Sequence, residues 1–120
     1  MRNQIPKMTK VLVTGGRKFK DEEYLVDALD VLKPSLIIQG GAKGADELAE
    51  LYATQRGIPC IEMKANWDYY NKGAGPIRNK WMLDFCYPDV VVAFPTKESI
   101  GTWNMVKLAK EAKIEIKIYG

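Results

Sequence analysis

Short apolar runs alternate with helical patterns along almost the whole chain, and this alternation constrains the fold more than any other feature. Runs of strand type occupy residues 10–15, 35–40, 59–63, 89–95 and 115–120. Four segments with the helical spacing of apolar residues lie between them, at about 22–33, 45–56, 76–86 and 101–112. Such alternation with short connections is typical of a parallel sheet with right-handed crossovers. We therefore predict one α/β domain, with a five-stranded, mainly parallel sheet and helices on both faces.

The domain is predicted to span residues 10–120. Residues 1–9 form an N-terminal leader that we expect to be flexible, and Met8 within it is an alternative start. The leader lacks the apolar segment of a signal peptide, and no apolar run in the sequence is long enough to cross a bilayer. The expected location is the cytoplasm, without a membrane partner.

The chain contains no histidine, and its two cysteines, Cys60 and Cys86, are far apart in the sequence. A Cys/His zinc site and the Ser-His and Cys-His nucleophile pairs are therefore excluded, and no metal site is expected. Any catalysis has to use carboxylates, arginine, lysine, tyrosine or bound water. The formal net charge of +3 is modest for a nucleic-acid-binding protein, so nucleic acid is not an expected partner.

The segments that follow the first four strands all contain glycines and cations. They are TGGRKF, QGGAKGAD, KANWDYYNKGAGPIRN and AFPTKESIGTWN. In an open parallel sheet these segments meet at one edge, where ligands bind near the reversal of strand order. Glycine lets the backbone approach an anion, and helix N-termini offer unpaired N–H groups. We predict an anionic ligand there, clamped by Arg78 in the first turn of its helix, with positive charge added by Arg17, Lys43, Lys72 and Lys97.

These segments lack the standard nucleotide-binding motifs, and several of their residues have structural explanations as well as functional ones. No segment matches the Walker pattern G-x-x-x-x-G-K-[ST], and TGGRKF does not match G-x-G-x-x-G. Gly15 and Gly16 are explained equally well by turn geometry, whereas the three glycines of GGAKGAD favour a ligand. Asp46 is either a first-turn carboxylate or a ligand contact, and Thr102 is either an N-cap or a ligand contact. Trp67 and its tyrosine neighbours form either a lid or apolar cover.

In this order and spacing, the motifs VLVTGGR, GGAKGAD, ANWD, GPIRN, AFP and GTWNMVKLAKEAKI resemble the small YspA-type branch of the SLOG superfamily. That superfamily includes the DprA/SMF DNA-processing proteins and the LOG phosphoribohydrolases, often labelled lysine decarboxylase-like. The resemblance implies a Rossmann-like fold that binds a nucleotide or nucleotide-derived, ADP-ribose-like ligand at the carboxyl ends of the strands. From the pattern and the resemblance together, the predicted ligand-binding residues are Gly15, Gly16, Arg17, Gly40, Gly41, Lys43, Gly44, Asp46, Trp67, Asp68, Gly75, Arg78, Asn79, Pro95, Gly101 and Thr102.

The chain departs from the LOG enzymes in the segment PTKESIGTWNM. LOG enzymes carry P-G-G-x-G-T-x-x-E, whose glutamate supports cleavage of an N-glycosidic bond. Here the double glycine is absent, and Met105 occupies the glutamate position. Ligand binding for sensing, carriage or sequestration is therefore the first functional prediction, with a small nucleotide as the partner.

The second prediction is hydrolysis of an N-glycosidic bond in a nucleotide, with Asp46 and Arg78 as the catalytic residues. The third is binding of single-stranded nucleic acid, by analogy with DprA. Sheet edges and exposed aromatic residues also make a homodimer an option.

Overall fold

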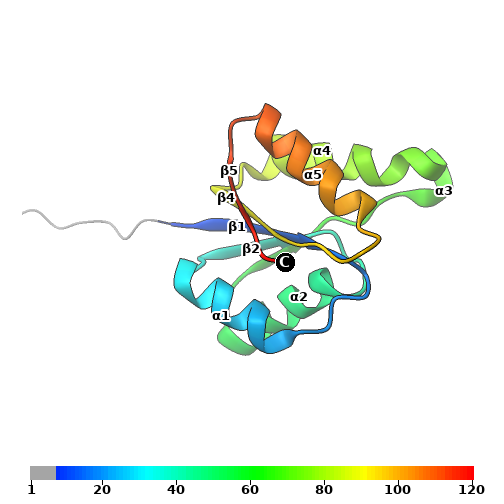
Figure 1. The fold of residues 1–120 in the computed structure, drawn as a ribbon. Helices are drawn as coiled ribbons and strands as arrows, with labels where there is room; N and C mark the ends of the chain where they lie inside the picture. Colours follow the sequence, from blue (N-terminus) through cyan, green and yellow to red (C-terminus); the bar gives the residue numbers. More distant parts are fainter. Residues whose placement is uncertain (1–7) are drawn as a thin grey trace, which may run out of the picture.

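The computed structural model of the protein describes residues 8–120, which form a five-stranded sheet with helices on both faces (Figure 1). All four pairs of neighbouring strands are parallel, so the predicted fold class is confirmed. Residues 1–7 of the predicted leader lie outside the described part of the chain. The order across the sheet is β3-β2-β1-β4-β5. The strands are β1 (Lys10–Gly15), β2 (Leu36–Gln39), β3 (Cys60–Glu62), β4 (Val90–Phe94) and β5 (Glu115–Ile118).

Two pairs of helices cover the two faces of the sheet. The helices are α1 (Glu22–Leu32), α2 (Ala45–Arg56), α4 (Ala74–Cys86) and α5 (Ile100–Glu111). Figure 1 shows α1 and α2 on one face and α4 and α5 on the other. Successive residues of β1 serve the two layers in turn, because side chains alternate along a strand. Val11 and Val13 pack with Leu29 of α1, whereas Leu12 packs with Met82 of α4 and Met105 of α5.

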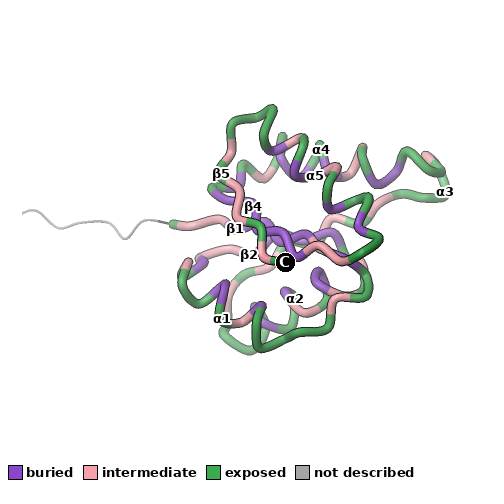
Figure 2. Tube along the Cα trace, viewed as in Figure 1, coloured by how far each residue is buried: buried purple, intermediate pink, exposed green. Residues whose placement is uncertain are grey.

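The central strands are buried from both sides, as their continuous apolar sequences predict (Figure 2). Burial is complete along β4, whereas the edge strands β3 and β5 are only partly covered. No helix within residues 8–120 combines the length and the apolar content that a bilayer crossing needs.

Two helix boundaries agree with the sequence. The Asp21 carboxylate caps α1 by accepting the Tyr24 N–H at 3.1 Å, and Gly57 ends α2 in the left-handed conformation. The segment before α4 was not predicted to contain a helix, and the structure corrects this. It forms a short helix, α3 (Trp67–Tyr70), and a 3₁₀ turn, because the Asn66 side chain accepts the Tyr69 N–H at 3.2 Å and starts the helix.

The helix α4 also begins earlier than predicted, at Ala74, so that Pro76 is its third residue. The first-turn amides of a helix have no partner within the helix, and a proline without an N–H is therefore tolerated there.

Candidate functional site

A cavity of about 460 Å³ lies at the carboxyl ends of β1 and β4, where the order of the strands reverses. The two loops that leave these strands lie side by side, because the Gly16 N–H donates to the Phe94 carbonyl oxygen at 3.0 Å. Segments from α3, α4 and the start of α5 complete the wall. This is the place where open parallel sheets hold their ligands.

The N-terminal turn of α5 opens onto this cavity. Ser99 occupies the N-cap position, but its hydroxyl makes no capping bond to the helix. The hydroxyl instead accepts the Thr96 N–H at 2.6 Å and lies 2.9 Å from the Thr96 hydroxyl. The first amides of α5 therefore have no side-chain cap, and they contribute the partial positive charge of a helix N-terminus.

Thr102 lies inside this first turn and is 2% exposed. The helix starts at Ile100, one residue before the predicted start at Gly101, so of the two explanations for Thr102 the N-cap is wrong and the ligand contact stays a prediction. Within residues 8–120, the Thr102 Oγ1 is the one buried side-chain polar atom without a hydrogen-bond partner. Thr102 lines the cavity, so a ligand bound there would lie next to the residue whose hydroxyl lacks a partner.

The loop between β2 and α2 is held from inside by Asp46. Its Oδ2 accepts the Gly40 N–H at 3.1 Å and the Ala42 N–H at 3.2 Å. The Gly41 N–H donates to the Gln39 side-chain oxygen. Both amides thus already have partners in the neighbouring elements, Asp46 of α2 and Gln39 of β2, and the predicted ligand contacts of Gly40 and Gly41 stay a prediction.

Two glycines of GGAKGAD are required by close approach of neighbouring groups. Gly44 has a φ of +82°, and a Cβ there would collide with the Gly16 carbonyl oxygen. A Cβ on Gly40 would collide with the Arg78 guanidinium and would lie 3.0 Å from the Asp46 carboxylate. These glycines thus allow the second loop to pack against the first loop and against α4.

Burial raises the pKa of Asp46 from 3.8 to about 6. The hydrogen bond from Ala42, the charge of Arg78 and the hydrogen bond from Gly40 act in the opposite direction, and the burial of the carboxyl outweighs them. Asp46 lines the cavity and is 6% exposed. The carboxyl therefore titrates close to neutral pH, in contact with the space where a ligand would lie.

Arg78 connects α4 to the ends of β2 and β3. Its Nη1 donates to the Gly40 carbonyl oxygen at 2.7 Å and to the Met63 carbonyl oxygen at 3.3 Å, and its Nε donates to the Asn79 Oδ1 at 3.0 Å. Burial lowers the pKa of Arg78, and the Asp46 charge partly restores it. The guanidinium lines the cavity, but these bonds make it first a support for the cavity wall.

Exposed cations and an indole ring form the rim of the cavity. Arg17, Lys18 and Lys72 contribute positive charge, and Trp67 is 47% exposed. The ring of Trp67 covers Gly75, where an added Cβ would lie 3.3 Å from the indole. No group of three metal-binding side chains of the His, Cys, Asp and Glu types gathers within residues 8–120. With its cations and its exposed indole ring, the rim suits an anion that carries a flat ring.

Comparison with known proteins assigns the chain to a family. Residues 9–70 match the model of the YspA, cpYpsA-related SLOG family. The chain is also 36% identical over 123 residues to the Gene 61 protein of Mycobacterium phage D29, covering 94% of this chain and 98% of that protein. The chain belongs to the YspA, cpYpsA-related SLOG family. The resemblance inferred from its motifs is thereby confirmed, and membership of this SLOG family indicates a nucleotide-related binding role.

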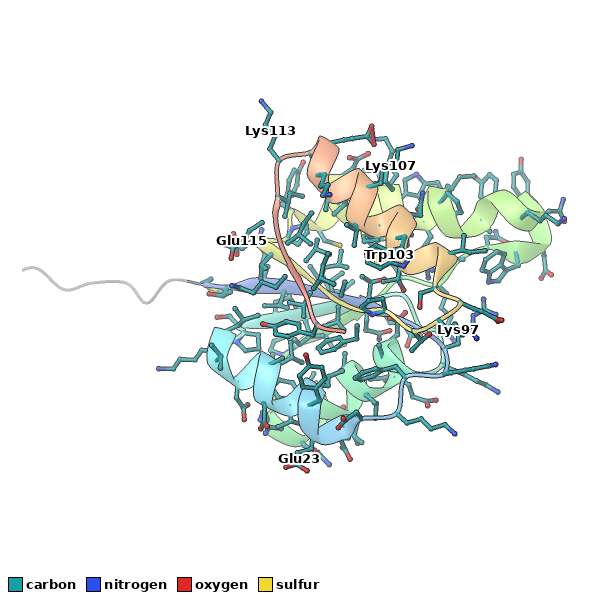
Figure 3. All side chains as sticks on the ribbon, in the orientation of Figure 1. Glu23, Lys97, Trp103, Lys107, Lys113 and Glu115 are labelled. Carbon is teal, nitrogen blue, oxygen red and sulfur yellow. The ribbon has the colours of Figure 1, made fainter. Side chains whose placement is uncertain are left out.

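The cavity at the carboxyl ends of β1 and β4 brings together most of the ligand-binding residues that were predicted from the sequence. Those that line it are Gly15, Gly16, Arg17, Asp46, Trp67, Gly75, Arg78, Asn79, Gly101 and Thr102. Those that do not line it are Gly40, Gly41, Lys43, Gly44, Asp68 and Pro95. Lys97 is also absent from the lining and lies on the exposed connection between β4 and α5 (Figure 3). The glycines outside the lining support the loops rather than face the cavity.

Several lining residues of this SLOG protein were missed by sequence reasoning. They are Thr14, Lys18, Ala42, Pro76, Thr96, Glu98, Ser99, Ile100 and Asn104. All of them lie in the four segments that were predicted to meet at the edge of the sheet, so their place in those segments was the signal that could have found them. Met105, at the position of the LOG glutamate, is fully buried in the core between the sheet, α4 and α5. No carboxylate projects into the cavity from that position.

Proposed function

We propose that this SLOG protein binds a nucleotide or an ADP-ribose-like ligand in the cavity, as a sensing, carrier or sequestering module. The observation that carries the proposal is the buried Thr102 hydroxyl without a partner, on the cavity wall at the N-terminus of α5. A buried polar atom without a partner costs free energy, and a ligand that bonds it removes this cost. The family membership supports a nucleotide-related ligand.

The cavity has chemically different parts that suit the parts of a nucleotide. The first turn of α5 and the cations Arg17, Lys18 and Lys72 favour the phosphate. The indole of Trp67 offers a flat surface for a base. The Asp46 carboxyl lies in the wall, where it would accept a hydrogen bond from a ribose hydroxyl.

The test is a titration of the protein with AMP, ADP-ribose and NAD, followed by calorimetry and by thermal unfolding. A bound nucleotide should raise the unfolding free energy by about 2.7 kcal/mol at a hundredfold excess over Kd. Failure of every one of these ligands to bind would refute the proposal.

Thr102→Val is the matched variant. It removes a hydroxyl that has no internal hydrogen bond, so the fold should be as stable as before. The affinity for AMP should fall roughly tenfold to a hundredfold, since a hydrogen bond to a charged group is worth about 1.5–3 kcal/mol. An unchanged affinity would mean that the hydroxyl does not contact the ligand.

Hydrolysis of the N-glycosidic bond is the second candidate function, because a carboxyl with a pKa of about 6 lies in the cavity wall. Asp46 and Glu98 are the carboxylates that line the cavity within the described residues. Incubation of the protein with nucleoside monophosphates, followed by chromatography, would detect a released base. Release that is abolished in Asp46→Asn, with nucleotide binding retained, would support hydrolysis, and intact substrate with the wild-type protein would exclude it for these substrates.

A further inference from the structure

A chain of side-chain hydrogen bonds runs along the cavity wall from α4 to α5. The Arg78 Nε donates to the Asn79 Oδ1 at 3.0 Å. The Asn79 Nδ2 donates to the Gly101 carbonyl oxygen at 3.2 Å and to the Asn104 Oδ1 at 2.9 Å. Asn79 is 3% exposed, and these bonds use both of its amide hydrogens and its oxygen. Asn79 therefore has its hydrogen-bonding capacity committed inside the protein.

The chemistry of the partners fixes the orientation of both amides. An arginine Nε–H only donates and a backbone carbonyl only accepts, so Asn79 has to place its oxygen toward Arg78 and its nitrogen toward Gly101. Asn104 then has to turn its oxygen toward the Asn79 nitrogen. The atom that remains is the Asn104 Nδ2, which has no hydrogen-bond partner within residues 8–120. Because Asn104 is half-buried and lines the cavity, the part of its side chain that is not engaged inside the protein is the Nδ2 group with its two donors, whereas its oxygen is turned toward Asn79.

We propose that Asn104 is a specificity-determining residue that donates to an anionic phosphoryl oxygen of the ligand, and that Asn79 is the positioning residue that keeps Asn104 in this orientation. This inference rests on the proposed nucleotide-binding function and names the group that is recognised. An ionised phosphoryl oxygen only accepts hydrogen bonds, so it matches the Nδ2 group of Asn104, which only donates. A ligand that places a donor beside the Asn104 Nδ2, such as an amino group or a cation, meets a second donor there and makes no hydrogen bond to it.

The charges around Asn104 favour the same class of ligand. Arg17, Lys18 and Lys72 line the same cavity, and the N-terminal turn of α5 carries partial positive charge. Glu98 is the one exposed carboxylate in the lining of the described chain, and it lies on the loop before α5. Cations and backbone amides attract any anion. The fixed donor of Asn104 adds a directional contact, which selects an acceptor with the right position.

The experiment compares AMP with adenosine, by calorimetry, in the wild type and in three variants. Asn104→Asp keeps the size of the side chain and replaces the donor by an anionic acceptor. Asn104→Ser removes the amide without adding charge, and it serves if the aspartate variant fails to fold. Asn66→Asp is the charge-matched control, because Asn66 caps α3 outside the cavity and aspartate is an equally good cap. We expect Asn104→Asp to weaken AMP roughly tenfold to a hundredfold and Asn104→Ser about tenfold.

Adenosine lacks the phosphoryl group, so its affinity should stay within about twofold in the Asn104 variants, and Asn66→Asp should bind both ligands as the wild type does. If the wild type binds AMP and the Asn104 variants bind it equally well, the inference is wrong while the proposed function stands. An equal loss of AMP and adenosine would also overturn the phosphoryl assignment. If the wild type binds no nucleotide, the proposed function fails and this inference fails with it.

Asn79→Asp tests the positioning role separately. An aspartate cannot donate to the Asn104 oxygen, so the Asn104 amide has to turn over and donate to the new carboxylate. The ligand would then meet an acceptor in place of a donor, and the preference for AMP over adenosine should fall roughly tenfold. The side-chain ¹H–¹⁵N signals of Asn104 should move downfield, because its N–H groups now donate to a carboxylate. A loss of packing alone would not cause this shift. Unmoved signals with an unchanged preference would overturn the positioning role.

Discussion

The buried carboxyl of Asp46 should make the stability of the fold fall as the pH rises, in contrast to a carboxylate that is stabilised by an ion pair. Burial raises its pKa from 3.8 to about 6. The folded chain then binds the proton more tightly than the unfolded chain does, so protonation stabilises the fold. This stabilisation is complete below about pH 3.8 and is lost as the pH rises through about 6. The difference between the two pKa values, 3.8 and about 6, corresponds to about 3 kcal/mol of unfolding free energy, at about 1.4 kcal/mol for each pKa unit.

Asp46→Asn removes the titration and keeps an oxygen that can accept the N–H groups of Gly40 and Ala42. The assay is urea unfolding of both proteins between pH 4 and pH 8, in buffers without phosphate. The remaining titratable groups are common to both proteins, so the difference in unfolding free energy isolates Asp46. We expect this difference to move in favour of Asp46→Asn by about 2.4 kcal/mol between pH 4 and pH 7, because the unfolded chain is already partly ionised at pH 4. A difference that does not change with pH, or that moves in favour of the wild type, would refute the reasoning.

Two further predictions concern the packing of the loops and helices. Gly44→Ala should lower the unfolding free energy, measured in urea, by more than about 2 kcal/mol, because φ is +82° and the new Cβ collides with the Gly16 carbonyl oxygen. The control Gly57→Ala has φ +66° and open space around the new Cβ, so it should lower the unfolding free energy by only about 1 kcal/mol. Equal costs would show that the contact is unimportant. Tyr52→Phe should cost about 1 kcal/mol in the same assay, since it removes the 2.8 Å hydrogen bond from the Tyr52 hydroxyl to Asp30, and an unchanged stability would contradict this.

The sheet could be predicted because its signal is local and repeated. Each central strand is a continuous apolar run, and β4 shows the resulting burial along its whole length. The segment of α3 gave no such signal. It is four residues long, buries none of them, and begins because the Asn66 side chain bonds the Tyr69 amide. A helix that depends on one cap rather than on an apolar face leaves no periodicity in the sequence.

The location of the cavity could be predicted from the same topology, but the role of each atom could not. The glycines of GGAKGAD indicated free amides, yet Gly40 donates to Asp46 from the following helix. Asn104 lies in the motif GTWNMVKLAKEAKI but was not among the predicted ligand-binding residues, and its orientation depends on Asn79, which is 25 residues earlier in the chain. Hydrogen-bond partners of this kind are set by tertiary packing. A sequence pattern therefore predicts which loop lies at the site, but not which atoms donate and which accept.

These contacts also decide which variants report on ligand contact. Asp46 and Arg78 bond the Gly40 amide and carbonyl from its two sides, so we expect a substitution that breaks either bond to displace the cavity wall before any ligand is present. Lost binding in such a variant is explained equally well by a displaced loop. The Thr102 hydroxyl has no partner within the described chain, so its removal breaks no internal bond. A loss of affinity in Thr102→Val with unchanged stability therefore measures a contact to the ligand, and it is the observation against which changes at Asp46 and Arg78 should be judged.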